Sequence, residues 1–268
     1  MVYLLLKNWF KDIFLLNKSH MKIAISLLTC SDENLLKPCL NSLLKSDITN
    51  YDYKLFCVDN NSKDNTISFL KSLECPIFLI ENKINEGIVI PRIILMENIL
   101  QENFDYTIEI HTDMLFPAYW LTPLLNEMND NTAIVAPFIL NNPNKIISVE
   151  ELENLVIKHK ENKIYNNIRQ VHPWVLNNKI VKKIGYYDSN YSPCECEDDD
   201  FMYNVIKNNY EFKANKNSIV LHYGGLTRTG LLKGNLSSKM QYFYTKNGLS
   251  VQDMINKYFT IHPVITIY

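Results

Sequence analysis

Runs of consecutive apolar residues alternate with segments of helical periodicity across the first half of the chain. The consecutive runs have the length and the continuous apolar character of strands that are buried on both faces of a sheet. They predict strands at 22–30, 53–60, 76–82, 105–114 and 131–140. The periodic segments between them predict helices at 32–46, 62–74, 88–103 and 118–128. Asp32 is the expected N-cap of the first helix.

This alternation predicts an α/β fold, in which helices cover both faces of a mostly parallel central sheet. Parallel strands present their carboxyl ends at one edge of the sheet, and ligands bind beyond that edge. Polar clusters follow the predicted strands at 29–32, 59–62, 82–87 and 111–113. A functional site is therefore expected where these clusters meet.

The alternation weakens after residue 140. The charged segment 147–162 predicts an exposed helix, 199–210 predicts another helix, and 217–225 predicts a strand. The rest of the chain shows no clear repeat and is expected to be an extension that packs on the main domain. The expected division of the chain is 1–20, 21–225 and 226–268.

Residues 1–20 are apolar with interspersed charges. One helical face would carry the side chains of Leu4, Leu5, Trp9, Ile13 and Leu16. Lys7, Lys11 and Asp12 interrupt the apolar run, so it is too short and too charged to span a bilayer. A packing helix is the first interpretation, and a helix that contacts a membrane surface is the second.

Composition is that of an ordinary globular domain, with 268 residues, 47% hydrophobic residues and a formal net charge of −2. A nearly neutral chain has no electrostatic footprint for nucleic acid, so no nucleic-acid partner is expected. The six cysteines include no CxxC pair, which indicates a reducing compartment. The expected location is cytoplasmic, and peripheral at the inner face of a membrane if residues 1–20 contact one.

Two of the polar clusters have the composition of a nucleotide site. VDNNSKDNT at 58–66 places Asp59 and Asn60 at a strand end, where they offer acceptors and donors to a base or ribose. Such residues are also common in ordinary turns and helix caps. In NEGIVIPR, Gly87 permits a close approach of the backbone, and Arg92 is able to reach a phosphate or to neutralise carboxylates.

Other clusters have the composition of a cation site. Asp113, in IEIHTDM, follows an apolar strand and is a natural ligand for Mg²⁺ or Mn²⁺, which prefer oxygen donors. His111 alone is better explained as a partly buried histidine. His222 ends a predicted strand before two glycines and is a candidate for a further metal ligand. Cys194 and Cys196 lack the second Cys or His pair that a tetrahedral site requires.

Residues 194–201 read CECEDDDF and contain four consecutive acids. A run of like charges usually marks a solvated face. Apolar-rich sequence follows at once, however, so the acids lead into an element that must pack. The residues by themselves leave three interpretations open: a decorated surface, a metal site of Cys and Asp, or part of an active site.

The order of these motifs resembles the family 2 inverting glycosyltransferases of the GT-A fold. The ordered set is more specific than any one motif. It consists of Thr29, VDNNSKDNT at 58–66, NEGIVIPR at 85–92, HTD at 111–113, IGYYD at 184–188, EDDDF at 197–201 and His222. The resemblance implies a Rossmann-like nucleotide-diphospho-sugar transferase fold. It also implies a nucleotide-sugar donor, a glycan or lipid-linked sugar acceptor, and Mn²⁺ or Mg²⁺ as cofactor.

The resemblance also implies roles for individual residues. Asp59 and Thr29 would contact the base and ribose, and Arg92 would lie near the diphosphate or the acidic centre. Asp113 would bind the cation with help from His222. The further nucleotide-sugar-binding positions are Asn60, Asn85, Gly87, His111 and Thr112. His111 departs from the family pattern, because the first position of the DxD motif is usually Asp.

In the acid run, the resemblance makes Asp198 the general base or, one residue earlier, Glu197. Asp200 is expected to steady the following helix, and Asp199 is the acid whose mutation is expected to matter least. Four aromatic residues are candidates either for stacking on acceptor sugar rings or for the core. They are Trp174, Tyr186, Tyr187 and Tyr191.

Two other functions remain as alternatives. A nucleotidyltransferase of similar layout usually has a Gly-rich, basic loop after the first strand, and LLTCSDEN has neither Gly nor Lys. A catalytically silent module that binds sugar nucleotides is the second alternative. The joint presence of Asp59, Asp113, Asp198 and His222 argues against such a loss of catalytic function.

Overall fold

The computed structural model describes residues 21–141, 146–169, 172–224, 235–259 and 265–266. The expectations for residues 1–20 lie outside these ranges. Among the helices that are described, none combines the length and apolar character that a membrane crossing requires.

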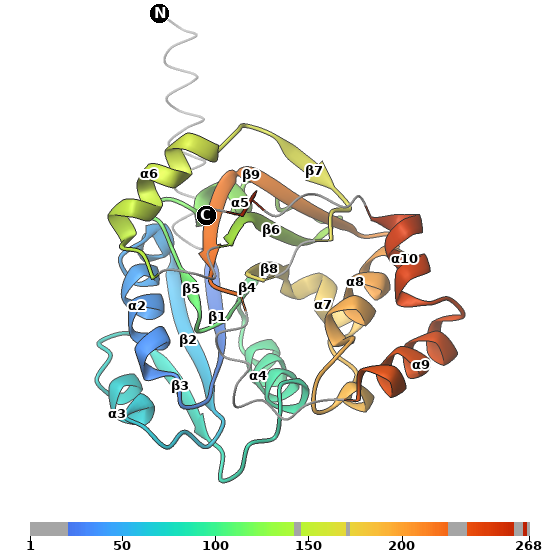
Figure 1. Cartoon of the computed structure of the whole chain (residues 1–268), viewed down its shortest axis with the longest axis horizontal. Helices are drawn as coiled ribbons and strands as arrows, with labels where there is room; N and C mark the ends of the chain where they lie inside the picture. Colours follow the sequence, from blue (N-terminus) through green and yellow to red (C-terminus); the bar gives the residue numbers. More distant parts are fainter. Residues whose placement is uncertain (1–20, 142–145, 170–171, 225–234, 260–264, 267–268) are drawn as a thin grey trace, which may run out of the picture.

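A single curled sheet forms the centre of the molecule (Figure 1). Its strands are β1 (Lys22–Thr29), β2 (Asp52–Asp59), β3 (Ile77–Glu81), β4 (Tyr106–Ile110), β5 (Met114–Leu115), β6 (Thr132–Asn141), β7 (Ile164–Asn166), β8 (Trp174–Asn177), β9 (Glu211–His222) and β10 (Ile265–Thr266). The main order is β3-β2-β1-β4-β8-β6-β9-β5, with β10 beside β6 and β7 beside β9. The expected α/β class with a mostly parallel sheet is therefore confirmed.

The helices surround this sheet. They are α2 (Glu33–Leu43), α3 (Thr66–Lys71), α4 (Val89–Gln101), α5 (Leu121–Leu125), α6 (Val149–His159), α7 (Asn178–Ile184), α8 (Glu197–Lys207), α9 (Leu236–Asn247) and α10 (Val251–Tyr258), with two 3₁₀ turns, η1 (Asp47–Asn50) and η2 (Ser189–Tyr191). All the strands and helices expected before residue 140 are present, with ends that differ by a few residues.

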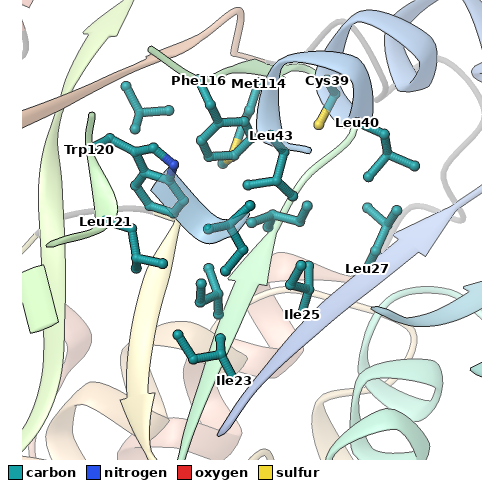
Figure 2. Packing of buried hydrophobic residues seen from close by; sticks show 14 of the residues in the cluster. Ile23, Ile25, Leu27, Cys39, Leu40, Leu43, Met114, Phe116, Trp120 and Leu121 are labelled. Atoms are coloured by element: carbon teal, nitrogen blue, oxygen red, sulfur yellow. The ribbon is translucent and has the colours of Figure 1, made fainter. Parts of the chain in front are cut away.

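Alternation along β1 explains how helices cover both faces of the sheet. Ile23, Ile25 and Leu27 point to one face, where they pack with Leu40 and Leu43 of α2 (Figure 2). The intervening Ala24 packs on the other face with Leu95 and Ile99 of α4. Successive side chains of a strand point to opposite faces, so a continuously apolar strand needs a cover on each.

The register of the strands brings the functional sequence motifs to one edge. The parallel pairing of β1 with β2 sets Thr29 opposite Asp59, and β4 ends beside β1 with Ile110 opposite Leu27. The short strand β5 pairs with β9, so that Met114 lies opposite His222. Residues that are widely separated in sequence therefore meet where the strands end.

A second core surrounds Trp174, and most of its residues come from the second half of the chain. This cluster contains Phe201 of α8 and extends to Phe243 and Met254, which belong to α9 and α10. Residues 226–268 are expected to form an extension that packs on the main domain, and the described part contains two helices that contribute to this core.

Two further expectations about local structure are wrong. Helix α8 begins at Glu197 rather than at residue 199, so the acids form its first turn. Strand β9 is 12 residues long and begins at Glu211 rather than at residue 217. Asp32 occupies the N-cap position of α2 as expected, but its side chain makes no capping hydrogen bond, because its carboxylate binds two threonines instead.

Candidate functional site

One corner of the site lies at the ends of β1 and β2. Thr29 and Thr112 both donate hydrogen bonds to the carboxylate of Asp32, which therefore links the ends of β1 and β4. Asp59 is fully buried, and its Oδ2 accepts a hydrogen bond of 2.9 Å from the amide of Ser62. Its Oδ1 has no partner among the described residues, and an unpaired carboxylate oxygen is an acceptor that a ligand is able to satisfy.

The loop before α4 is held together by one buried amide. The Nδ2 of Asn60 donates to Asn85 Oδ1 and to the Gly87 carbonyl, both at 2.8 Å. Its Oδ1 accepts from the amide of Glu86 at 3.0 Å and from Asn82 Nδ2 at 3.1 Å. Because these contacts occupy both ends of the Asn60 amide, this side chain shapes the wall of the site.

Arg92 lies beneath the site and is buried. Its guanidinium donates to the carbonyls of Ser26 and Ile110, at 3.1 and 2.8 Å, and its Nε lies 3.3 Å from Glu109 Oε1. Glu109 also lies 3.1 Å from His172 Nε2. Burial raises the pKa of Glu109, but the charges of Arg92 and His172 outweigh it and hold that pKa at about 2.

A cluster of potential metal ligands lies at the centre of the edge. One donor atom from each of His111, Asp113 and His222 lies within 4.8 Å of the others. His222 Nε2 is 3.1 Å from Asp113 Oδ1, and two ligands of a small octahedral cation lie ~3 Å apart. Asp113 Oδ2 is buried and has no hydrogen-bond partner in the described part of the chain. These donors therefore fit a divalent cation.

The acidic turn of α8 lies beside this cluster. Within the turn, Glu197 is buried, whereas the Asp198 side chain is 35% exposed. The Tyr187 hydroxyl lies 2.5 Å from Asp198 Oδ1, and His172 Nδ1 lies 3.8 Å from Asp198 Oδ2. The ring of His172 in turn packs on that of His111, with centroids 4.7 Å apart. The acidic turn and the potential metal ligands are thus in one connected site.

Burial raises the pKa values of Glu197 and Asp198 above their ordinary values. Together with the neighbouring charge of Asp198, it raises the pKa of Glu197 to about 8. Burial also raises the pKa of Asp198, while His172 and the Tyr187 hydroxyl act in the opposite direction. Both shifts favour the protonated carboxyl group, as expected for neighbouring carboxylates in a poorly solvated site.

The other two acids, Asp199 and Asp200, form ion pairs with basic side chains outside the site. Asp199 Oδ1 accepts a hydrogen bond of 2.8 Å from Arg169 Nε. Asp200 lies 2.7 Å from Lys246 of α9 and so joins α8 to the C-terminal segment. All six cysteines are free, and neither Cys194 nor Cys196 belongs to the one cluster of potential metal ligands within the described ranges.

For three of the four aromatic candidates, burial supports the core alternative over stacking on an acceptor. Trp174 and Tyr191 are fully buried, and Tyr187 is 8% exposed. Trp174 stacks on His172 instead, with ring centroids 4.1 Å apart. All three rings belong to the buried apolar cluster that includes Phe201 of α8.

Three residues of this site were not identified from the sequence as site residues. They are Asp32, Glu109 and His172. Glu109 gave a usable signal, because an acid within an apolar strand is almost never buried without a partner. His172 gave none, since its neighbours Glu109, His111 and Asp198 are all far from it in sequence.

The comparison with protein families supports one assignment. A model described as "Glycosyl transferase family 2" matches residues 25–177. This range includes the strand ends with Thr29, Asp59 and Asp113. A comparison with curated protein sequences finds no match.

Solved structures give the same fold. The structure of GalNAc-T7 with UDP, GalNAc and Mn²⁺ superposes with a TM-score of 0.63 at 12% identity, covering 90% of this chain and 57% of that one. S. aureus TarS 1–349 in complex with UDP gives 0.57 at 16% identity, covering 75% of this chain and 60% of that one. The chain thus spans less than two thirds of either neighbour, and at such identities the likeness concerns the fold.

Proposed function

The chain belongs to glycosyl transferase family 2, and from this premise we propose that it transfers a sugar from a nucleotide-diphosphate donor to a hydroxyl group of a glycan or lipid-linked acceptor. We propose further that the reaction inverts the configuration at the anomeric carbon. The observation that carries the proposal is the pairing of a partly exposed carboxylate, Asp198, with the ligand cluster of Asp113 and two histidines. In this arrangement Asp198 would activate the acceptor hydroxyl, and the Asp113 cluster would hold the cation beside the donor diphosphate.

The donor nucleotide would bind at the ends of β1 and β2. The unpaired Oδ1 of Asp59 is an acceptor for a base or ribose group. Thr29 and Thr112 lie on either side of Asp32 and line the same edge. The loop that Asn60 organises contributes the backbone of Asn85 and Gly87 beside this edge. In two fold neighbours UDP is bound, which supports a nucleotide diphosphate as the group recognised.

Asp113, His222 and His111 would hold the divalent cation. The unpaired, buried Oδ2 of Asp113 and the mutual distances of the three donors support this assignment. When bound, a divalent cation neutralises the negative charge that develops on the leaving diphosphate. The fold neighbour GalNAc-T7 contains Mn²⁺, which supports Mn²⁺ or Mg²⁺ as the cofactor.

Asp198 would be the general base. It takes the proton of the acceptor hydroxyl while that oxygen forms a bond to the anomeric carbon. The bond from this carbon to the donor phosphate breaks on the opposite face, and the nucleoside diphosphate leaves with the electron pair. Asp198 suits this role better than Glu197, because it is the more exposed of the two and is oriented by Tyr187.

The stereochemistry of the product tests this mechanism. Proton NMR of the first product formed from an α-linked donor should show a β-linked sugar, because one displacement inverts the centre. An α-linked product would contradict the single displacement and remove Asp198 from the proposed role.

A further inference from the structure

Helix α9 binds the segments that carry the proposed base. The ammonium of Lys246 lies 2.7 Å from Asp200 Oδ2 in α8 and 2.8 Å from Asp188 Oδ2 in the loop before it. The side chains of Asp200 and Asp188 are only 7% and 20% exposed, so solvent screens these pairs less than a surface ion pair. The ammonium group of Lys246 thus joins two segments that flank Asp198.

Asp200 is held from three directions. Besides Lys246, the Tyr191 hydroxyl and the Asn247 amide donate to its Oδ1, at 3.1 and 3.0 Å. Side chains two positions apart in an α-helix differ in direction by about 200°. Asp200 and Asp198 therefore leave the first turn of α8 on opposite sides. The contacts on Asp200 therefore fix the rotation of the turn that presents Asp198.

The same face of α9 holds the loop that precedes α8. Lys239, Tyr242 and Lys246 recur at spacings of three and four, which places them on one side of the helix. Their contacts with the loop, besides that of Lys246, are Lys239 Nζ with the carbonyls of Asn190 and Ser192 at 2.6 Å each, and the Tyr242 hydroxyl with Asp188 Oδ2 at 2.9 Å. Helix α9 therefore binds this loop through both its side chains and its backbone carbonyl groups.

The other side of this loop reaches the donor site. The carbonyl of Pro193 accepts hydrogen bonds from the amides of Ile88 and Val89, at 2.7 and 3.2 Å, where α4 begins. Gly87 packs so closely that a Cβ there would lie 2.5 Å from Pro193 Cβ. The loop is thus fixed between α9 and the backbone beside the proposed nucleotide.

We propose that the face of α9 formed by Lys239, Tyr242 and Lys246 is a positioning element for the catalytic turn. Lys246 is its central positioning residue: it acts through Asp200 and Asp188 and contacts neither donor nor acceptor. The inference rests on the proposed function, because its effect on turnover passes through Asp198. Reaction geometry is sensitive to displacements of about 1 Å, so loss of Lys246 should lower turnover and leave donor binding intact.

The test compares Lys246→Met with Lys246→Arg and with the control Lys257→Met. Lys257 lies on α10 with its ammonium over the Tyr258 ring, so the control removes the same charge elsewhere. Hydrolysis of UDP-, GDP- and dTDP-sugars with Mn²⁺ is measured well below the melting temperature. We expect kcat to fall roughly 10- to 100-fold in Lys246→Met, with an unchanged donor KM. Lys246→Arg should retain most of the wild-type kcat, since a guanidinium is able to bridge two carboxylates.

Hydrogen exchange gives a readout that does not depend on activity. The amides of residues 200–204 should lose protection in Lys246→Met and keep it in Lys246→Arg and Lys257→Met. Unchanged exchange in Lys246→Met, or a loss of activity that appears only as a raised KM, would overturn the positioning role. If the wild-type protein hydrolyses none of these donors, the proposed function fails, and the exchange data alone decide whether α9 controls α8.

Discussion

Adjacent carboxylates in the first turn of α8 have different surroundings. Glu197 is buried with an unpaired Oε2, and Asp198 is partly exposed and bound by Tyr187. We predict that Asp198→Asn lowers turnover by about 10²- to 10⁴-fold, the usual contribution of a general base. Donor affinity, measured by calorimetry with UDP and Mn²⁺, should stay within a factor of about three. Glu197→Gln serves as the matched control, and a larger loss in it than in Asp198→Asn would assign the base to Glu197.

Tyr187 tests whether the base must be oriented. Its hydroxyl lies 2.5 Å from Asp198 and 3.2 Å from Glu109, while its ring is part of the core. Tyr187→Phe keeps the ring and removes the hydroxyl. A hydrogen bond to a charged group contributes about 1.5–3 kcal/mol, so kcat should fall about tenfold or more. Steady-state kinetics check this, and full activity in the variant would show that Asp198 needs no such support.

Glu197 should make stability depend on pH. Its pKa rises from 4.5 to about 8 on folding, so the folded protein holds a proton there that the unfolded chain releases. Stability from this group is complete below pH 4.5 and is lost as the pH rises toward 8. Urea denaturation of the wild type should therefore show a free energy of unfolding that falls between about pH 5 and 8. The fall should be smaller in Glu197→Gln, and an identical pH dependence in both proteins would contradict the shifted pKa.

At the scale of single residues, the sequence predicts those site residues that belong to a recognisable local motif. Asp113 and His222 stand at strand ends, and their types alone suggest a cation site. Glu109 is visible as an acid within an apolar strand, but its pairing with Arg92 and His172 is not, because both come from distant segments. His172 becomes visible only through packing. Burial and partner geometry are three-dimensional properties, so no local pattern reports them.

Among the elements, the loop before α4 depends on a single glycine. Gly87 has φ +80°, and a Cβ there would meet both side chain and backbone of Pro193. Gly87→Ala should cost about 2–5 kcal/mol, from the left-handed backbone and the clash together. Gly248→Ala is the control, since Gly248 has φ +74° but an open surrounding, and it should cost about 1–2 kcal/mol. Equal costs in urea denaturation would show that the contact with Pro193 carries no weight.

The elements before residue 140 were predictable because buried parallel strands and covering helices differ in apolar periodicity. The start of α8 was not, because four acids read as a loop although they are favourable near a helix N-terminus, whose dipole attracts negative charge. The position of β8 between β4 and β6, antiparallel to both, was equally hidden. Strand order follows from long-range packing, which a local pattern does not encode.

For the whole molecule, the parallel sheet accounts for the position of the site. The strand ends bring the proposed nucleotide-binding residues and the cluster of potential metal ligands to one edge, where the alternating pattern predicts a site. The C-terminal helices were not recognised, because their few buried residues, such as Phe243 and Met254, become apolar contacts only beside Trp174. They add α9 to the site as a support that the family match, which ends at residue 177, does not include.

Turnover of nucleotide-diphosphate sugars tests the central claim most directly. Purified protein is incubated with UDP-, GDP- and dTDP-sugars, with and without Mn²⁺, and the released nucleotide is measured. We predict that at least one donor is turned over, that EDTA abolishes the reaction, and that Asp113→Ala loses the response to added metal. If none of these donors is bound or turned over by the wild-type protein, the assignment as a glycosyltransferase is contradicted.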